Sequence, residues 1–222
     1  MGVTDMDHLN FSPMTLAHRV RGFSMIEVLV TLVIVTMGLL GLAGLKARAH
    51  IAELESYQRA QALVLVSDMV ERVRLNRANG SCFAITSAAS GSPWYGTGAA
   101  GFAACSAGAA TQNTRADEGK NDWSNLLMGS SETSTSGGVT TNVGTIIGGR
   151  GCVTYDAASE IINSTTGIAM SGTGIYTVSV AWQGMADTVA NAVNLCGTGN
   201  YGGEAKRRVV STAFRIANLQ LN

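Results

Sequence analysis

The sequence predicts an α+β protein in which a long N-terminal α-helix packs on a small antiparallel β-sheet head domain with long, disulfide-closed loops. Three observations lead to this fold: an uncharged apolar run at residues 28–45, a proline-free amphipathic continuation to about residue 79, and strand patterns after residue 150. The apolar run has the length of a membrane-spanning helix. A chain of 222 residues has room for this helix and one modest domain.

The helix is expected to start at Phe23 and to continue beyond the apolar run to about Ala78. After residue 45, apolar residues recur mostly at spacings of three or four or their multiples, which is typical of an amphipathic helix (Ile51, Leu54, Leu65, Met69, Val73). Cations gather near the expected end, where they complement the negative pole of the helix (Arg72, Arg74, Arg77). Asn79 and Gly80 then supply a stop signal.

The remainder of the chain predicts strands separated by long loops. Strands are expected at residues 152–155, 175–183 and 208–216, and the second alternates most clearly. Residues 81–119 and 130–149 are rich in Gly, Ala, Ser and Thr and predict loops, in which the Trp94-Tyr95 pair is expected to pin its loop to the domain. A short helix is expected to begin at Asn121 or Asp122 and to carry Trp123, Leu126 and Leu127.

The residues at the start of the apolar run carry a family resemblance. The string Gly22-Phe23-Ser24-Met25-Ile26-Glu27-Val28-Leu29, preceded by Arg19 and Arg21, resembles the class III signal of type IV pilins and type II secretion pseudopilins. The resemblance implies that a prepilin peptidase cuts after Gly22 and methylates the new amino terminus at Phe23. It also implies that Glu27 pairs with that amino group on a neighbouring subunit. Met1 and Met14 both remain possible start residues.

Four segments follow from this resemblance together with the helix pattern. They are a leader peptide at residues 1–22, a transmembrane or filament-core helix half at 23–45, an amphipathic helix half at 46–79, and a globular pilin head at 80–222. Residues 60–76, 176–184 and 207–210 further resemble the PilV-type minor pilins, also called type IV pilus modification proteins. Unlike the major pilins, the chain has no proline in this helix, so their proline-centred kink is not carried over.

All four cysteines follow the apolar run: Cys82, Cys105, Cys152 and Cys196. Their wide spacing is unlike that of a zinc site, and an oxidising compartment favours disulfides. Three connectivities are possible; we favour Cys82 with Cys105, which closes a flexible loop, and Cys152 with Cys196, which ties two strand regions. Basic residues flank the apolar run on both sides, with two arginines before it and Lys46 and Arg48 after it, so charge alone does not indicate its orientation in the membrane. The cysteines favour a head domain outside the cytoplasm.

Other chemistry has little support in the sequence. The net charge is zero, so no nucleic-acid partner is expected, and outside the leader the only histidine is His50. No nucleophile motif is present, so we expect no enzyme, no cofactor and no metal. The acidic and amide residues 117, 118, 121 and 122 are expected to form a solvated, capped turn in preference to a calcium site. Lys206, Arg207 and Arg208 are expected to form a solvated strand edge.

A minor type IV pilin is the function that these features predict. Its expected partners are other major and minor pilins through the N-terminal helix, the prepilin peptidase and inner-membrane lipid. The protein is expected to cross the inner membrane once before assembly and to lie in the pilus at the cell surface afterwards. A type II secretion pseudopilin is the first alternative, and a signal-anchored periplasmic enzyme or receptor is the second. The glycines at positions 38, 41 and 44 have three possible explanations. They allow neighbouring helices to approach closely, they form a point where the helix can stretch, or they are present only because glycine is common in membrane helices.

Overall fold

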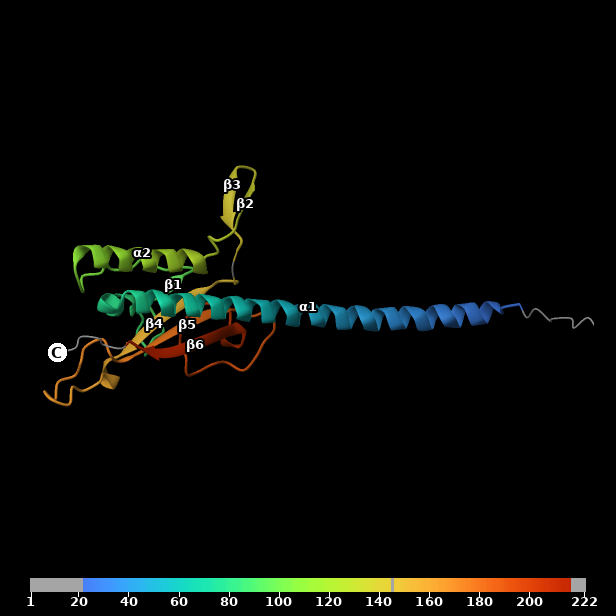
Figure 1. The fold of residues 1–222 in the computed structure, drawn as a ribbon. Coiled ribbons are helices and arrows are strands. Elements are labelled where there is room, and N and C mark those ends of the chain that lie inside the picture. The colour runs from blue at the N-terminus through green and yellow to red at the C-terminus, as the bar shows by residue number, and fades with distance from the viewer. Residues whose placement is uncertain (1–21, 145, 217–222) are drawn as a thin grey trace, which may run out of the picture. The chain divides into compact units, whose positions relative to one another are not determined.

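The computed structural model describes residues 22–144 and 146–216 and consists of two compact units, Met1–Ala47 and Arg48–Asn222 (Figure 1). Helix α1 (Met25–Leu75) is a single 51-residue helix that contributes to both units. It ends slightly before the expected Ala78, and a 3₁₀ helix at Arg77–Phe83 follows. The layout, a long N-terminal helix with an antiparallel sheet and two disulfides, is α+β and pilin-like, as the sequence predicts.

The second unit contains a four-stranded antiparallel sheet in the order β1-β4-β5-β6. Its strands are β1 (Tyr95–Gly96), β4 (Arg150–Asp156), β5 (Ile175–Gln183) and β6 (Arg207–Arg215). Strand β5 has the bounds that its alternating pattern predicts, and β4 and β6 differ from the prediction only at their ends. Strand β1 was not predicted, because it is only two residues long and lies in a segment expected to be a loop.

The two faces of the sheet contribute to different clusters of buried residues. The main core contains Val66, Met69 and Val73 of α1. It also contains alternate residues of β5: Tyr176, Val178, Val180 and Trp182. Ala181 and Cys152 belong instead to a smaller cluster with Cys196 and Tyr201. Each fully buried large apolar side chain stabilises the fold by about 1.5 to 3 kcal/mol relative to an exposed one. The period-two alternation of β5 therefore determines which residues lie between the sheet and α1.

Helix α2 (Ala110–Leu127) corrects one expectation from the sequence. Residues 110–119 were expected to belong to a loop, and a helix was expected only from Asn121 onward. In the structure the helix begins at Ala110, and Asn121 and Asp122 lie inside it, so neither residue is its N-cap. Within the second unit, α2 packs directly on β1 and β4, and it contacts α1 through the hydrogen bond from Trp123 Nε1 to the Leu65 carbonyl.

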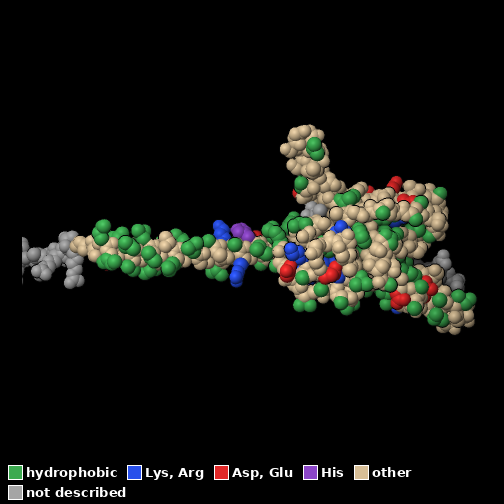
Figure 2. Space-filling view, turned by 180° about the vertical axis from the view of Figure 1, so that it is seen from behind, with side chains coloured by type: hydrophobic (Ala, Val, Ile, Leu, Met, Phe, Trp, Pro, Cys, Tyr) green, Lys and Arg blue, Asp and Glu red, His purple; other side chains and the backbone are tan. Residues whose placement is uncertain are grey.

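A β-hairpin occupies part of the second expected loop. Strands β2 (Thr133–Ser136) and β3 (Val139–Asn142) pair antiparallel, and Gly137 and Gly138 form the turn with φ of 58° and 80°. Positive φ at both central residues is the geometry of the tight turns that suit two-residue hairpins. Every residue of both strands is exposed, and the hairpin projects from the rest of the unit (Figures 1 and 2).

Candidate functional site

The residues around the expected cleavage point lie in a non-helical segment just before α1. Gly22, Phe23 and Ser24 have no regular secondary structure, and the Phe23 side chain is exposed. A peptidase needs an accessible, non-helical bond, and the Gly22-Phe23 bond meets this requirement. Arg19 and Arg21 lie outside the described residues.

Ser24 caps the start of α1. Its Oγ accepts a hydrogen bond from the Ile26 backbone N–H at 3.3 Å, and its carbonyl accepts one from the Glu27 N–H at 3.0 Å. Helix starts leave backbone N–H groups without partners inside the helix, and a serine oxygen satisfies one of them. Ser24 and Glu27 also have the spacing of a capping box, a local signal that the sequence analysis did not use.

Glu27 lies in the first turn of α1, where a negative charge is favourable at the positive pole of the helix. Its side chain is exposed, and among residues 22–144 and 146–216 its carboxylate has no ion-pair partner. The structure therefore presents a charge at the edge of an apolar surface. Such a charge is costly in lipid or in a protein core unless a partner is supplied.

The first part of α1 displays apolar side chains on all sides. Within residues 22–47 every side chain is exposed, and hydrophobic groups cover this stretch of helix (Figure 2). By length and composition α1 is the one helix in the described chain able to cross a membrane. The hydroxyls of Thr31 and Thr36 donate to the carbonyls of Val28 and Val33, both at 2.9 Å, so they do not need water.

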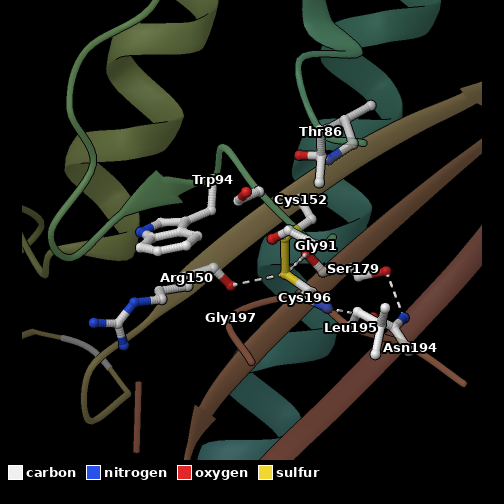
Figure 3. Close-up of a disulfide and its surroundings, with 12 residues drawn as sticks. Thr86, Gly91, Trp94, Arg150, Cys152, Ser179, Asn194, Leu195, Cys196 and Gly197 are labelled. Atoms are coloured by element: carbon white, nitrogen blue, oxygen red, sulfur yellow. Dashed lines mark hydrogen bonds between the residues drawn. A yellow bond between two sulfur atoms is a disulfide. The ribbon is translucent and has the colours of Figure 1, made fainter. Parts of the chain in front are cut away.

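Two disulfides connect the head: Cys82 with Cys105, and Cys152 with Cys196. These are the two pairs that the sequence favours. The first joins the 3₁₀ helix after α1 to the segment before α2, with a Cα–Cα distance of 5.4 Å. Within the described residues no cysteine is free. The second joins β4 to the loop before β6, with a Cα–Cα distance of 5.8 Å (Figure 3).

Polar groups fix the loops on both sides of the second disulfide (Figure 3). The Asn194 amide donates to the Ser179 hydroxyl at 2.8 Å, which holds the loop that carries Cys196 against β5. The guanidinium of Arg150 lies 5.5 Å from the ring centroid of Trp94 and 5.0 Å from that of Tyr201. These distances are those of cation–π contacts. Tyr95, the neighbour of Trp94, is fully buried, so this aromatic pair pins its loop as expected.

Asp117 and Lys120 form a structural ion pair on α2. The Asp117 carboxylate accepts from Lys120 Nζ at 2.8 Å and from the Cys105 backbone N–H at 2.8 Å. The Lys120 hydrogen bond, together with that N–H, lowers the pKa of Asp117 against the opposing effect of burial. Oδ2 of Asp122 lies 3.6 Å from Nη1 of Arg72 on α1. These carboxylates therefore connect helices and loops, and no cluster of three acidic, His or Cys residues is present among the described residues.

Arg207 corrects a second expectation. It was expected on a solvated edge with Lys206 and Arg208, but its side chain is 1% exposed. Its guanidinium donates to Glu204 at 2.6 Å and to the Asn194 carbonyl at 2.7 Å, and it also donates to the carbonyls of Asn191 and Cys196. A buried arginine is tolerated when its donors are satisfied in this way. Arg207 thus holds the cysteine-bearing loop in place instead of facing solvent, whereas Lys206 is exposed as expected.

Comparison with known proteins identifies one segment of the chain. Residues 17–43 match the family model of the prokaryotic N-terminal methylation motif. This match covers Gly22, Phe23 and Glu27 and the start of α1, and it supports a type IV pilin-like protein, either a pilin or a pseudopilin. That class is structural and not catalytic, and the motif with its apolar helix is consistent with membrane anchoring. No curated protein and no solved structure matches the chain.

Proposed function

We propose that the protein is a minor type IV pilin of the PilV type, a structural subunit of the type IV pilus. The observation that carries this proposal is the combination in one helix of the methylation motif, an exposed apolar first part and a second part that forms the core of an α+β head. An enzyme needs a catalytic constellation, whereas this molecule offers a docking helix and a disulfide-closed head. The four segments with boundaries at residues 22, 45 and 79 are part of the proposal.

In this function the leader is removed after Gly22, and Phe23 becomes the methylated first residue. The helix holds the subunit in the inner membrane as a single span until it joins other pilins at the cell surface. The apolar side chains supply affinity between neighbouring helices. Glu27 supplies register, because a misplaced subunit leaves Glu27 and the neighbour's amino group unpaired in an apolar environment.

Outside the membrane-spanning part, α1 keeps exposed apolar side chains on the side that does not contact the sheet. Leu54, Tyr57 and Val64 are between 48% and 64% exposed. Exposed apolar residues that line a helix at these spacings are typical of surfaces that another helix covers. They support helix packing in a filament as the role of this half of α1 as well.

Mass spectrometry of sheared surface filaments tests the proposal. We expect an intact mass without residues 1–22 and with one added methyl group. Two deletion strains separate the pilus from the pseudopilus: one lacks the pilus assembly ATPase and the other lacks the type II secretion ATPase. A minor pilin disappears from the sheared fraction only in the first strain. Loss only in the second strain would instead identify a pseudopilin, and an intact leader in filaments would refute the assignment.

A further inference from the structure

A groove of about 360 Å³ in the head combines two arginines with an indole N–H that has no partner among the described residues. Its lining includes Glu55 and Arg59 from α1, Trp182 from β5, and Arg208 and Val210 from β6. Neither the methylation motif nor the disulfides involve these residues. The groove therefore needs an explanation of its own.

The charges of the groove sum to one uncompensated cation. Glu55 accepts from Arg208 at 3.2 Å and from the backbone N–H groups of Met185 and Ala186 at 3.0 and 3.1 Å. These contacts lower the pKa of Glu55, chiefly through the Ala186 N–H, so the carboxylate balances Arg208. The Arg59 side chain is exposed and has no ion pair or hydrogen bond within the described residues. Its guanidinium remains available to an anion that enters the groove.

Trp182 provides the second, independent observation. Its side chain lines the groove, the residue is only 3% exposed, and its Nε1 has no hydrogen-bond partner in the part of the chain that the structure describes. The other two tryptophans are bonded: Trp94 Nε1 donates to the Thr97 carbonyl at 3.1 Å, and Trp123 Nε1 to the Leu65 carbonyl at 2.9 Å. Buried donors are almost always paired, so this N–H lacks the acceptor that a buried donor normally has.

We propose that this groove binds the carboxylate of an aspartate or glutamate side chain on a neighbouring subunit. A carboxylate is an acceptor only, as the Trp182 N–H and the Arg59 guanidinium require. Val209 and Val210 also line the groove, where they can cover the methylene groups of the incoming side chain. A doubly charged phosphate fits less well, because the Glu55 carboxylate is part of the same lining. The inference rests on the proposed function for the source of the carboxylate.

Tryptophan side-chain NMR signals provide the test. The isotope-labelled full chain without its leader, in detergent micelles, is titrated with the blocked tripeptide acetyl-Ala-Glu-Ala-amide. We expect a saturable shift of the Trp182 indole N–H signal, while the signals of Trp94 and Trp123 stay in place. The Arg59→Gln variant is expected to bind about two- to fivefold more weakly, as for a partly exposed ion pair. Arg115→Gln removes an exposed arginine of α2 outside this groove and should leave the affinity unchanged.

Each other outcome overturns the proposal. An equal shift with the matching glutamine peptide would show that charge is not recognised, and unchanged binding by Arg59→Gln would remove the role of that residue. A larger response to inorganic phosphate, or to phosphatidylglycerol vesicles, would assign the groove to a phosphate ligand. The absence of any Trp182 shift would refute the site. The titration uses the isolated chain, so its outcome does not depend on whether the protein is found in pili. Failure of the carboxylate site and failure of the proposed pilin function can therefore be distinguished.

Discussion

The indole of Trp123 occupies the space that a side chain at Gly151 would need. A Cβ at Gly151 would lie 2.2 Å from Cη2 and 2.3 Å from Cζ3 of the Trp123 ring, far inside van der Waals contact. Trp123 is fully buried on α2, and Gly151 lies on β4, so this contact sets how closely the helix approaches the sheet. The Trp123 Nε1–H also donates to the Leu65 carbonyl of α1, so the ring is held against both α1 and β4.

Gly151→Ala should therefore destabilise the head by about 1 to 3 kcal/mol, the usual cost of overpacking a core. Trp123→Phe removes ring atoms from the clash and should also destabilise, because it leaves a cavity and loses the Leu65 bond. Urea unfolding of both single variants and of the double variant checks the coupling. We expect the double variant to lose less stability than the two single losses together. Strict additivity would contradict the proposed contact.

Glu27→Gln should lower the amount of the protein in pili relative to the membrane. Glutamine can still serve in a capping box, so this change removes the charge and keeps the local helix signal. Leaving the neighbour's amino group buried without a partner costs about 3 to 5 kcal/mol, which corresponds to a loss of at least about a hundredfold in an equilibrium constant. Quantitative immunoblots of sheared pili and membranes measure the ratio.

Glu53→Gln is the matched control, because Glu53 lies on the same helix outside the apolar run and its side chain is 79% exposed. It should leave the ratio of pilus to membrane protein unchanged. Equal ratios for wild type and Glu27→Gln would show that helix packing alone sets register.

The two disulfides should contribute unequally to the stability of the head. In the chain-entropy description, a cross-link stabilises more when it closes a longer loop. The sequence separation is 44 for Cys152–Cys196 and 23 for Cys82–Cys105, which corresponds to about 4 and about 3.4 kcal/mol. Paired Cys→Ser variants, compared by urea unfolding, should show the larger loss for the first pair. The reverse order would mean that packing around the bridges outweighs loop length.

Stability should fall on acidification in part through Asp117. A carboxyl whose pKa is lowered in the folded state stabilises the protein above its unfolded pKa of about 3.9, and this contribution is lost as the pH falls through the folded value. Asp117→Asn should therefore be less stable than wild type at pH 7, by about 1 to 3 kcal/mol for loss of bonds to a charged group. The difference should shrink below about pH 4.

Urea unfolding at pH 7 and pH 3 compares these proteins, with Asp187→Asn as the control. Asp187 is exposed and has no ion pair among the described residues, so its variant should follow wild type at both values. A difference for Asp117→Asn that is the same at both pH values would exclude this ion pair as the cause.

Strands β4, β5 and β6 and the long helix could be predicted because large apolar residues mark them. Tyr176, Val178 and Val180 alternate along β5, and no residue of α1 interrupts its helical pattern. Helix α2 could not be predicted over its whole length, because its buried face is made largely of small or polar residues, which show no hydrophobic period (Ala116, Gly119, Lys120, Trp123, Ser124, Leu127). At the candidate site, the prediction of Gly22, Phe23 and Glu27 rests on a local motif that the sequence alone shows. The burial of Arg207 depends on a loop that folds over from residues 191–196 and has no local signal.

The two cystines also limit how far the head can lengthen under tension. When a force pulls α1 away from a point beyond Cys196, it passes through each sulfur–sulfur bond and bypasses the enclosed segment. Residues 83–104 and 153–195 then add no extension, although each free residue would supply about 3.3 to 3.6 Å. A head with both bridges intact can therefore lose helix and sheet contacts under load and still keep nearly half of its chain within two covalent loops.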